Sequence, residues 1–390
     1  MADASNKLIL IHYHEIGLKG KNRGRFEQQL LTNINRALKD VPRGSAKRLT
    51  GRMILELEPG SPLDIIRQRL AGVFGVANFS EAVGVAPAIE TIRKTAGEMA
   101  RETTFRSFKI ATKRGDKSFP MTSEEVNRDV GAYVQNQSRA QVKMDAPDWT
   151  CHIEISPQRT FLYAEKIQGP GGLPVGSNER ALSLISSGID SPVASYRMMK
   201  RGVRLSFLHF HSQPYTDRNS QRNTEELVRL LTQHQYKSTL FLVPFVEIQR
   251  HIMTHAPASY RVVLYRRSML RIAEEIAQRE GAPALVTGEN VGQVASQTLT
   301  NLKTIEEVTL LPVLRPLAGH NKDEIITEAR HIGTYEISIE PYEDCCSVFV
   351  PKHPETKANL DRVHRIEADL NLAPIIAQTL DQTEVKTFKF

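Results

Sequence analysis

Two patterns of hydrophobic residues divide the chain. Up to about residue 168, apolar and polar residues alternate in short segments typical of half-buried strands, and stretches with apolar residues at helical spacing separate these segments. Residues 8–86 predict strand, helix, strand, helix and strand, a βαββαβ-like pattern that indicates a ferredoxin-like unit. Residues 89–167 predict helix, strand, helix and two strands. The first part of the chain is therefore expected to hold two small α+β units.

The second pattern begins after a segment rich in glycine and proline (GPGGLPVGSN), which we interpret as a linker. Beyond it, short and almost uninterrupted apolar strands alternate with helices, and this pattern predicts a parallel sheet covered on both faces. In such sheets, ligands bind at the carboxyl ends of the strands. We assign the chain to the α/β class and place its parts at residues 1–75, 76–168, 169–178 (the linker) and 179–390.

The formal net charge of +7 is confined to the first part of the chain. Residues 1–173 hold 26 Lys and Arg against 19 Asp and Glu, whereas residues 174–390 hold 25 of each kind. The basic residues concentrate in residues 19–25, 43–52 and 106–117. Basic residues on several loops match a nucleic-acid backbone, but such runs are also typical of solvated faces. Charge alone leaves both interpretations open.

Composition excludes several classes of protein. No window of roughly 18 residues is continuously apolar, and the N-terminal segment lacks a signal-peptide pattern, so we expect a soluble, cytoplasmic protein with no membrane partner. Three cysteines, with Cys345 and Cys346 adjacent, cannot form a disulfide framework. No C-x-x-C or Cys/His spacing indicates zinc or an iron–sulfur cluster, so we expect neither. Cys151 lies in an alternating strand and is expected to be a core residue.

A loop of small residues, Ser186–Ser191, follows the predicted strand ALSLI and precedes a predicted helix. This arrangement points backbone N–H groups and the positive end of a helix dipole at an anion. The loop lacks the G-K-[ST] of the Walker loop, which excludes an ordinary kinase or GTPase site. A strand–turn–helix unit capped by Asp190 and Ser191 would have a similar sequence, so the loop alone leaves a purely structural role open.

The S-x-G-x-D-S pattern of this loop resembles the PP-loop of ATP pyrophosphatases, enzymes that cleave ATP between the α and β phosphates to adenylate a substrate. The loop and other segments follow one another in the order expected of tRNA 4-thiouridine synthetases, over nearly the whole chain. Six motifs between about residues 8 and 360 carry the resemblance to that family: HYHEIGLKGKNRGRFE, FKIATKRGDKSFPMTSEEVNRDVG, LISSGIDSPVAS, TGENVGQVASQTLTNL, RPLAGHNKDEI and YEDCCSVFVPKHPETK.

The resemblance implies a ferredoxin-like N-terminal domain, a THUMP domain that holds tRNA by its acceptor end, and a parallel-sheet PP-loop adenylating domain. It implies that the protein uses ATP and Mg²⁺ to adenylate O4 of uridine 8 in tRNA, and then replaces this oxygen with sulfur to give 4-thiouridine. This order is chemically reasonable because AMP is a good leaving group and a uracil oxygen is not. The basic residues then expected to bind tRNA are Lys19, Lys21, Arg23, Arg25, Lys113, Arg114 and Lys117.

The family also implies roles for residues of the last domain. Asp190 is expected to be catalytic or linked to Mg²⁺, and no other metal ligand is predicted from the protein. Lys322 matches a family lysine tied to adenylation. The residues expected to contact ATP are Leu184, Ile185, Ser186, Ser187, Gly188, Ser191, His209, Phe210, Arg266, Gly288 and Gln297. For Leu184, Ile185 and Phe210, core packing is the alternative.

The loop departs from the family at one position, because the family usually has two glycines there and Ser187 replaces the first. A residue other than glycine costs on the order of 1 kcal/mol where φ must be positive. Either φ is negative at Ser187, or the loop is slightly strained.

Sulfur chemistry is expected of one adjacent cysteine. Cys345 or Cys346 matches the family thiol that attacks or resolves a persulfide, and the sequence does not choose between them. Better-known members carry a C-terminal rhodanese domain with a persulfide cysteine, whereas this sequence has no cysteine after Cys346. Sulfur is therefore expected from a separate persulfide donor, either a cysteine desulfurase or a rhodanese-type carrier, or from sulfide.

Further partners follow from the family. Homodimers are common in it, and it is linked to sulfur transfer to a carrier protein for the thiazole of thiamine. That carrier reaction is one alternative function, although the basic first part would be superfluous for it. The other alternative is a tRNA-binding protein with a decayed PP-loop, and the retention of Asp190, Ser191 and the TGEN segment argues against it.

Overall fold

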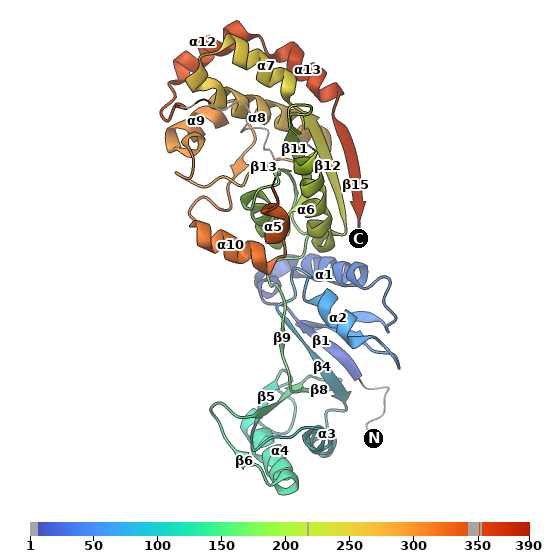
Figure 1. Cartoon of the computed structure of the whole chain (residues 1–390). Coiled ribbons are helices and arrows are strands. Elements are labelled where there is room, and N and C mark those ends of the chain that lie inside the picture. The colour runs from blue at the N-terminus through green and yellow to red at the C-terminus, as the bar shows by residue number, and fades with distance from the viewer. Residues whose placement is uncertain (1–6, 217, 342–350, 352) are drawn as a thin grey trace. The chain divides into compact units, whose positions relative to one another are not determined.

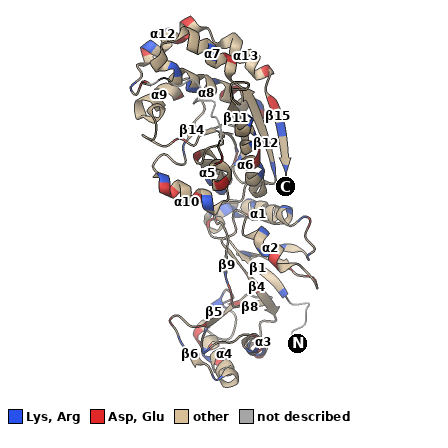
Figure 2. Cartoon of the chain, in the orientation of Figure 1, with Lys and Arg blue, Asp and Glu red and all other residues tan. Residues whose placement is uncertain are grey.

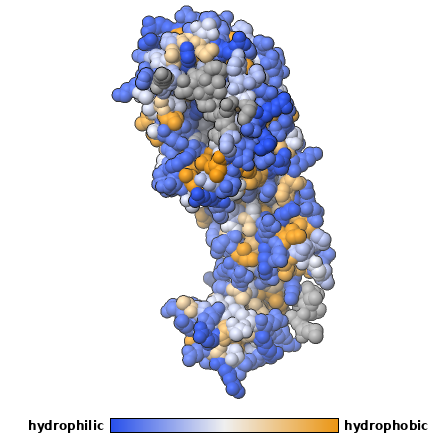
Figure 3. Space-filling model, in the orientation of Figure 1, coloured by the Kyte–Doolittle hydropathy of each residue, from blue (hydrophilic) through white to orange (hydrophobic). Residues whose placement is uncertain are grey.

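The computed structural model describes the chain except residues 1–6, 217, 342–350 and 352. It divides into two compact units, Met1–Pro174 and Val175–Phe390, each with its own sheet and hydrophobic core (Figure 1). Among the described residues, no helix combines the length and apolar character needed to span a bilayer. The face of the molecule seen in Figure 3 is accordingly mostly hydrophilic, with scattered hydrophobic residues.

The first unit is built on a nine-stranded sheet with the order β2-β3-β1-β4-β8-β7-β5-β6, in which β9 also pairs with β4. Its first segment has the predicted ferredoxin-like order βαββαβ. The elements are β1 (Lys7–His12), α1 (Arg23–Ala37), β2 (Ala46–Leu49), β3 (Arg52–Glu56), α2 (Leu63–Leu70) and β4 (Asn78–Val85). The hydrophobic pattern missed β2 because this short edge strand has no buried residue.

The second segment of this unit adds two long helices and five strands. They are α3 (Ile89–Arg101), β5 (Ser107–Arg114), α4 (Ser123–Ser138), β6 (Gln141–Val142), β7 (Trp149–Ile155), β8 (Thr160–Tyr163) and β9 (Ile167–Gln168). Alternate residues of β7, including Cys151 and Ile153, are buried in one cluster with residues of α3 and α4. Because β4 pairs with β1 along one edge and with β8 along the other, both segments share one sheet.

A buried carboxylate joins the two segments across this sheet. Glu154 of β7 is 5% exposed, and its oxygens lie 2.5 Å from Arg52 Nη1 of β3 and 2.9 Å from His12 Nε2 of β1. The hydroxyl of Tyr163 on β8 donates to the same carboxylate (2.8 Å). Burial alone would raise the pKa of Glu154, but these partners lower it to about 2. The cluster therefore links four strands through one negative charge.

The second unit has a six-stranded sheet with the order β14-β13-β10-β11-β12-β15. The predicted parallel sheet is confirmed for its first five strands, whereas β15 pairs antiparallel with β12. The sequence pattern missed β15 because its alternation carries few apolar residues. The strands are β10 (Arg180–Leu184), β11 (Arg204–His211), β12 (Lys237–Pro244), β13 (Leu285–Val286), β14 (Val313–Leu314) and β15 (Glu384–Lys389).

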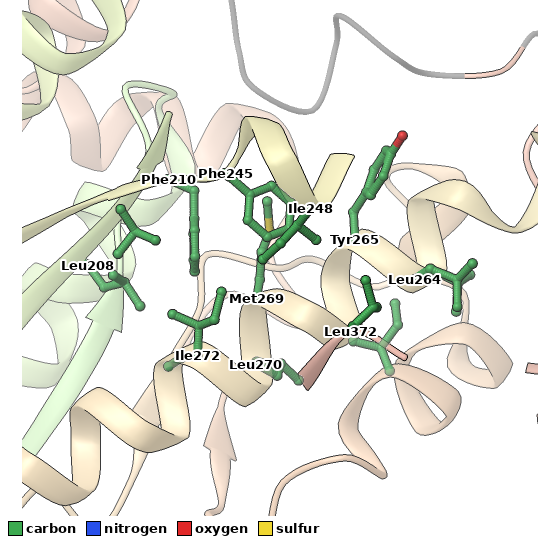
Figure 4. Packing of buried hydrophobic residues seen from close by; sticks show 14 of the residues in the cluster. Leu208, Phe210, Phe245, Ile248, Leu264, Tyr265, Met269, Leu270, Ile272 and Leu372 are labelled. Atoms are coloured by element: carbon green, nitrogen blue, oxygen red, sulfur yellow. The ribbon is translucent and has the colours of Figure 1, made fainter. Parts of the chain in front are cut away.

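Helices cover both faces of this sheet. The helices are α5 (Asp190–Lys200), α6 (Asn219–Gln235), α7 (Val246–His255), α8 (Arg261–Glu280), α9 (Leu299–Glu306), α10 (Lys322–His331), α11 (Tyr335–Ser338), α12 (Leu360–Leu370) and α13 (Ala373–Asp381). Leu208 and Phe210 of β11 pack with Phe245, Met269 and Ile272 on one face (Figure 4). His209 between them faces α6 instead, where it contacts Ser220. The alternation along β11 therefore serves two buried faces.

Arg267 of α8 is the largest fully buried side chain of the described residues, and it is 1% exposed. Its guanidinium donates to both oxygens of Glu367 on α12 (2.9 and 2.8 Å), to Glu307 next to α9 (2.9 Å) and to the carbonyl of Thr304. Arg271 also donates to both oxygens of Glu367 (2.6 and 2.8 Å). Burial would raise the pKa of Glu367, but hydrogen bonds from Arg271 and Arg267 lower it to about 2.

This network predicts a pH-dependent stability. Because the pKa of Glu367 is lower in the folded state, its contribution is present above the pKa of the unfolded chain, about 4.5, and is lost as the pH falls toward 2. Glu367→Gln should lower the free energy of unfolding at pH 7 by about 3 kcal/mol, since it leaves Arg267 buried without a full counter-charge. Urea unfolding at pH 7 and pH 3 should show the wild type approaching the variant at the lower pH.

The control is Glu247→Gln on α7, which removes an exposed ion pair with Arg250 (3.2 Å). It should change the free energy of unfolding by less than about 1 kcal/mol at either pH. A Glu367→Gln variant as stable as this control would contradict the role given to the network.

Candidate functional site

The small-residue loop lies between the carboxyl end of β10 and the first turn of α5, as the sequence predicted. Ser191 holds it closed, because its Oγ accepts from the backbone N–H of Ser186 (2.8 Å) and its hydroxyl donates to the carbonyl of Ser186 (3.2 Å). The N–H of Gly188 donates to Ser186 Oγ (3.3 Å). α5 begins at Asp190, so its N-terminal N–H groups and the positive end of its dipole lie at this loop.

A cavity of about 170 Å³ lies at the carboxyl ends of β10, β11 and β13. The structure brings together ten predicted residues around it: Leu184, Ile185, Ser186, Asp190, Ser191, His209, Phe210, Arg266, Gly288 and Gln297. Four further lining residues were not predicted: Leu208, Met269, Thr287 and Glu289. Residues from three strand–loop segments and from α8 therefore converge on one hollow.

Gly288 allows one wall of this cavity to form. It follows β13 and lies against the first turn of α5, so that a Cβ at this position would be 2.6 Å from the backbone nitrogen of Ser191 and 2.7 Å from its Cα. Any larger residue would push the two segments apart, and both atoms are backbone that cannot move aside easily. Glycine is therefore required here by close approach.

Asp190 and Lys322 meet at the loop end of the cavity. Lys322 begins α10, and its Nζ lies 2.7 Å from Asp190 Oδ1. A capping box at Asn321 and Glu324 fixes the start of that helix. The amide of Gln293 donates to the other oxygen, Oδ2, at 3.2 Å. A cation and a carboxylate beside a helix N-terminus suit a nucleotide phosphate with its metal ion, because the lysine can neutralise phosphate charge and the carboxylate can hold Mg²⁺.

A buried carboxylate organises the opposite wall. Glu289 accepts from Arg266, from Arg315 Nε (2.8 Å) and from the hydroxyl of Thr287 (3.0 Å). Burial would raise its pKa, but the charges of Arg266 and Arg315 lower it. Arg266 is thereby held at the cavity, with its side chain 26% exposed.

The remaining walls are apolar. Leu208, Phe210 and Met269 lie together there, and Phe210 also packs edge-on against Phe245 (5.2 Å between ring centroids). The Oε1 atom of Gln297 is buried and has no hydrogen-bond partner among the described residues. An apolar slot with one free acceptor suits a flat heterocycle that carries an amino group, such as adenine.

Two predicted loop residues lie behind the cavity and do not line it. Ser187 is fully buried, and its hydroxyl lies 3.3 Å from Ser220 Oγ of α6. Gly188 accepts at its carbonyl from the hydroxyl of Ser338 (3.4 Å). Ser187 is not among the described non-glycine residues with positive φ. Of the two alternatives raised by the sequence, negative φ therefore applies, and the serine does not strain the backbone.

The basic residues predicted to bind tRNA lie in the first unit, where Lys and Arg are coloured blue in Figure 2. Arg23 pairs with Glu27 (2.8 Å) and donates to the hydroxyl of Tyr13 (2.7 Å), and Arg114 donates to the carbonyl of Met121 (3.1 Å). Lys19 lies over the ring of Phe26. These three are half-buried, whereas the exposed ones are Lys21, Arg25, Lys113 and Lys117.

The predicted thiols cannot be placed, because Cys345 and Cys346 lie outside the described residues. Cys151 is buried, as expected, and burial raises the pKa of its thiol to about 12. Within the described part of the chain, no three His, Cys, Asp or Glu side chains form a group that could hold a metal ion.

Sequence reasoning missed Glu289, Gln293 and Arg315. Glu289 and Gln293 stand in the TGENVGQVASQT motif, so proximity to Gly288 was the available signal. Arg315 is the first residue of the RPLAGHNKDEI motif, so the motif was its available signal, although nothing in it indicated a pairing with Glu289.

Comparisons with known proteins agree with this geometry. The family model described as "Thiamine biosynthesis protein (ThiI)" matches residues 176–372, and models of the ThiI ferredoxin-like domain and the THUMP domain match residues 8–80 and 86–165. A "Probable tRNA sulfurtransferase" of Moorella thermoacetica is 44% identical over 380 residues, covering 97% of both chains. One of Thermus thermophilus is 42% identical over 382 residues, covering 98% of this chain and 94% of the relative.

Two solved structures resemble most of the chain. The crystal structure of a 4-thiouridine synthetase–RNA complex with bound ATP matches with a TM-score of 0.89 and 36% identity, covering 98% of this chain and all of that one (100%). A Pyrococcus horikoshii protein matches with a TM-score of 0.66 and 25% identity, covering 84% and 99%. The predicted ferredoxin-like, THUMP and PP-loop parts are confirmed, and the chain belongs to the ThiI family, in which relatives are named probable tRNA sulfurtransferases.

Proposed function

We propose that this chain is an ATP-dependent tRNA sulfurtransferase that converts uridine 8 of tRNA to 4-thiouridine. The observation that carries the proposal is the convergence of the loop, the Asp190–Lys322 pair and an apolar slot on one cavity. Membership of the ThiI family, and the likeness to a 4-thiouridine synthetase with bound ATP and RNA, support the same reaction. ATP would place its base among Leu208, Phe210 and Met269 and its phosphates at the loop.

The first step is adenylation. O4 of the uracil attacks the α-phosphorus of ATP, a bond from O4 to phosphorus forms, the proton on N3 of the ring passes to solvent, and pyrophosphate leaves with the electrons of the broken P–O bond. The N–H groups at the start of α5 and the ammonium of Lys322 stabilise the negative charge that grows on the phosphates. Asp190 would hold the Mg²⁺ that accompanies ATP, once Lys322 turns from the carboxylate to a phosphate.

The second step is displacement by sulfur. The terminal sulfur of a persulfide attacks C4 of the adenylated ring, and AMP leaves with the former O4, so that C4 is joined to the donor through an S–S bond. The thiolate of Cys345 or Cys346 would then attack the donor's sulfur, which leaves the other sulfur on C4 and forms a disulfide with the donor cysteine; an external thiol would reduce this disulfide for the next turnover. Free sulfide would attack C4 directly, with no S–S bond to break. The physiological donor would be a cysteine desulfurase or a rhodanese-type carrier. The phosphates of the tRNA would be held by the exposed basic side chains of Lys21, Arg25, Lys113 and Lys117.

A second reaction remains a candidate because the matching family model is described by thiamine biosynthesis. In it, the same cavity would activate a carboxyl group of a sulfur-carrier protein. The two reactions differ in the molecule that triggers pyrophosphate release, and that difference makes them separable by assay.

Asp190→Asn tests the adenylation site. With Mg²⁺-ATP and unmodified tRNA, the wild type should release pyrophosphate only when tRNA is present, and the variant should be slower by at least about a hundredfold because it loses the charge that holds the metal ion. Lys322→Met should be slowed similarly. The control is Asp369→Asn on α12, an exposed carboxylate remote in sequence from the loop. Wild-type protein that releases no pyrophosphate in response to tRNA would contradict the adenylation proposal and favour a decayed PP-loop.

Salt titration tests the tRNA surface. Binding of tRNA should weaken steeply as the salt concentration rises, because each phosphate contact releases counterions. Lys113→Ala with Lys117→Ala should weaken binding and reduce the slope of log Kd against log salt by about one per lost contact. Lys200→Ala, in the second unit, serves as a control that removes one positive charge elsewhere in the chain. Equal slopes for all variants would show that the residues predicted here do not contact the phosphates.

Cys345→Ser and Cys346→Ser test the sulfur step. With a persulfide donor, one or both variants should still release pyrophosphate yet form little 4-thiouridine, because adenylation needs no thiol and sulfur transfer does. Pyrophosphate and 4-thiouridine are measured in the same reaction. If both single variants thiolate tRNA as the wild type does, the thiol role is wrong.

A further inference from the structure

Ser187 has no contact with the cavity that binds the phosphates in our proposal, although it lies in the middle of the loop. It is 0% exposed and is absent from the lining of the cavity. Its backbone φ is not positive, so the glycine usual at this position in the family is not required here. The side chain therefore brings a hydroxyl into the protein interior without backbone strain.

That hydroxyl is one member of a chain of buried polar groups. Ser187 Oγ lies 3.3 Å from Ser220 Oγ on α6, and Ser220 Oγ lies 3.2 Å from Nε2 of His209 on β11. Nδ1 of His209 lies 3.0 Å from the carbonyl oxygen of Ile185, which directly follows β10. The Thr224 hydroxyl lies farther from the same nitrogen, at 3.4 Å. These groups thus connect Ser187 of the loop, through Ser220 and His209, to Ile185, which directly precedes the loop. Together with the backbone from Ile185 to Ser187 they close a ring.

The direction of each hydrogen bond follows from the carbonyl oxygen of Ile185, the last group in this series of polar groups. A carbonyl oxygen can only accept, so Nδ1 of His209 carries the hydrogen, and in a neutral imidazole Nε2 is then an acceptor. With a neutral imidazole, Ser220 donates to Nε2 and Ser187 donates to Ser220. The hydroxyls of Ser187 and Ser220 therefore each donate one hydrogen bond within the ring.

We propose that Ser187 is a positioning residue, which holds the loop from behind in its phosphate-binding shape before ATP arrives. This inference rests on the proposed function only in taking ATP as the ligand. On the cavity side, Ser186 and Ser191 close the loop through their own hydrogen bonds. On the buried side, the ring ties the loop to β11 and α6, and Ser338 holds the carbonyl of Gly188. A loop fixed on both sides loses less conformational freedom when the phosphates bind.

ATP binding to the purified protein, without tRNA or sulfur donor, tests the proposal by calorimetry. Ser187→Ala removes the hydroxyl and should weaken ATP binding by about two- to tenfold. In the separate pyrophosphate assay with tRNA, it should raise the KM for ATP with little change in kcat. Ser187→Gly should weaken binding at least as much, because it also frees the backbone. Ser220→Ala leaves the loop sequence intact and should have the same effect as Ser187→Ala.

The double variant distinguishes two hydroxyls that act together in the ring from two hydroxyls that act independently. If the hydroxyls act as a unit, Ser187→Ala with Ser220→Ala should bind ATP no more weakly than either single variant. The matched control is Ser238→Ala on β12, which removes a buried hydroxyl that accepts a hydrogen bond from Thr232 of α6 (2.7 Å), and it should leave ATP binding unchanged. Single variants that bind like the wild type, or losses that add fully in the double variant, would overturn the proposal.

The imidazole of His209 gives a readout independent of ATP. In ¹⁵N-histidine-labelled protein, Nδ1 should carry the proton and Nε2 should show the signal of a hydrogen-bonded acceptor. Ser220→Ala should move Nε2 toward the value of a free acceptor, and Ser187→Ala should move it less in the same direction. A His209→Asn variant assigns the signal. A proton on Nε2, or no movement in either serine variant, would also overturn the ring. If the wild type binds no ATP, the proposed function is wrong. The ¹⁵N signals of His209 then still show whether the hydrogen bonds of the ring are formed.

Discussion

The close approach of Gly288 to the first turn of α5 is the constraint on which the site depends. The two segments come near enough that a single Cβ would collide with the backbone of Ser191. This contact sets the end of β13 beside the loop that follows β10, and it leaves the N-terminal N–H groups of α5 directed into the cavity. The position of Asp190 follows from the same contact, since this residue starts the helix. Lys322 and Gln293 then reach its carboxylate from other segments.

Buried carboxylates complete the framework around this constraint. Glu154 in the first unit is held by Arg52 and His12, whereas Glu289 and Glu367 in the second are each held by two arginines. Burying such charges costs several kcal/mol each, and only close paired partners offset the cost. Arginine suits this task because its planar fork can bind both oxygens of a carboxylate. At Glu289 the arrangement also has a functional consequence, because it presents Arg266 to the cavity.

Much of the architecture could be predicted from the hydrophobic pattern, and the site needed the motifs as well. Alternation in β7 and the almost uninterrupted apolar residues in β11 each predicted the correct kind of strand, because one face or both faces of those strands are buried. The edge strands β2 and β15 bury too little to leave such a pattern. The pairing of Glu289 with Arg315 could not be predicted, because it depends on strands that only the sheet brings together. The burial of the Ser187 side chain could not be predicted for the same reason, because its partner Ser220 lies on a different element, α6.

The central claim is that O4 of a tRNA uridine is adenylated in this cavity and then displaced by sulfur. It is tested most directly with tRNA that carries ¹⁸O at O4 of uridine 8, incubated with the protein, Mg²⁺-ATP and a persulfide donor. The account predicts that the AMP released alongside 4-thiouridine contains the ¹⁸O label, because the displaced oxygen leaves on the phosphate. Formation of 4-thiouridine with unlabelled AMP would contradict it.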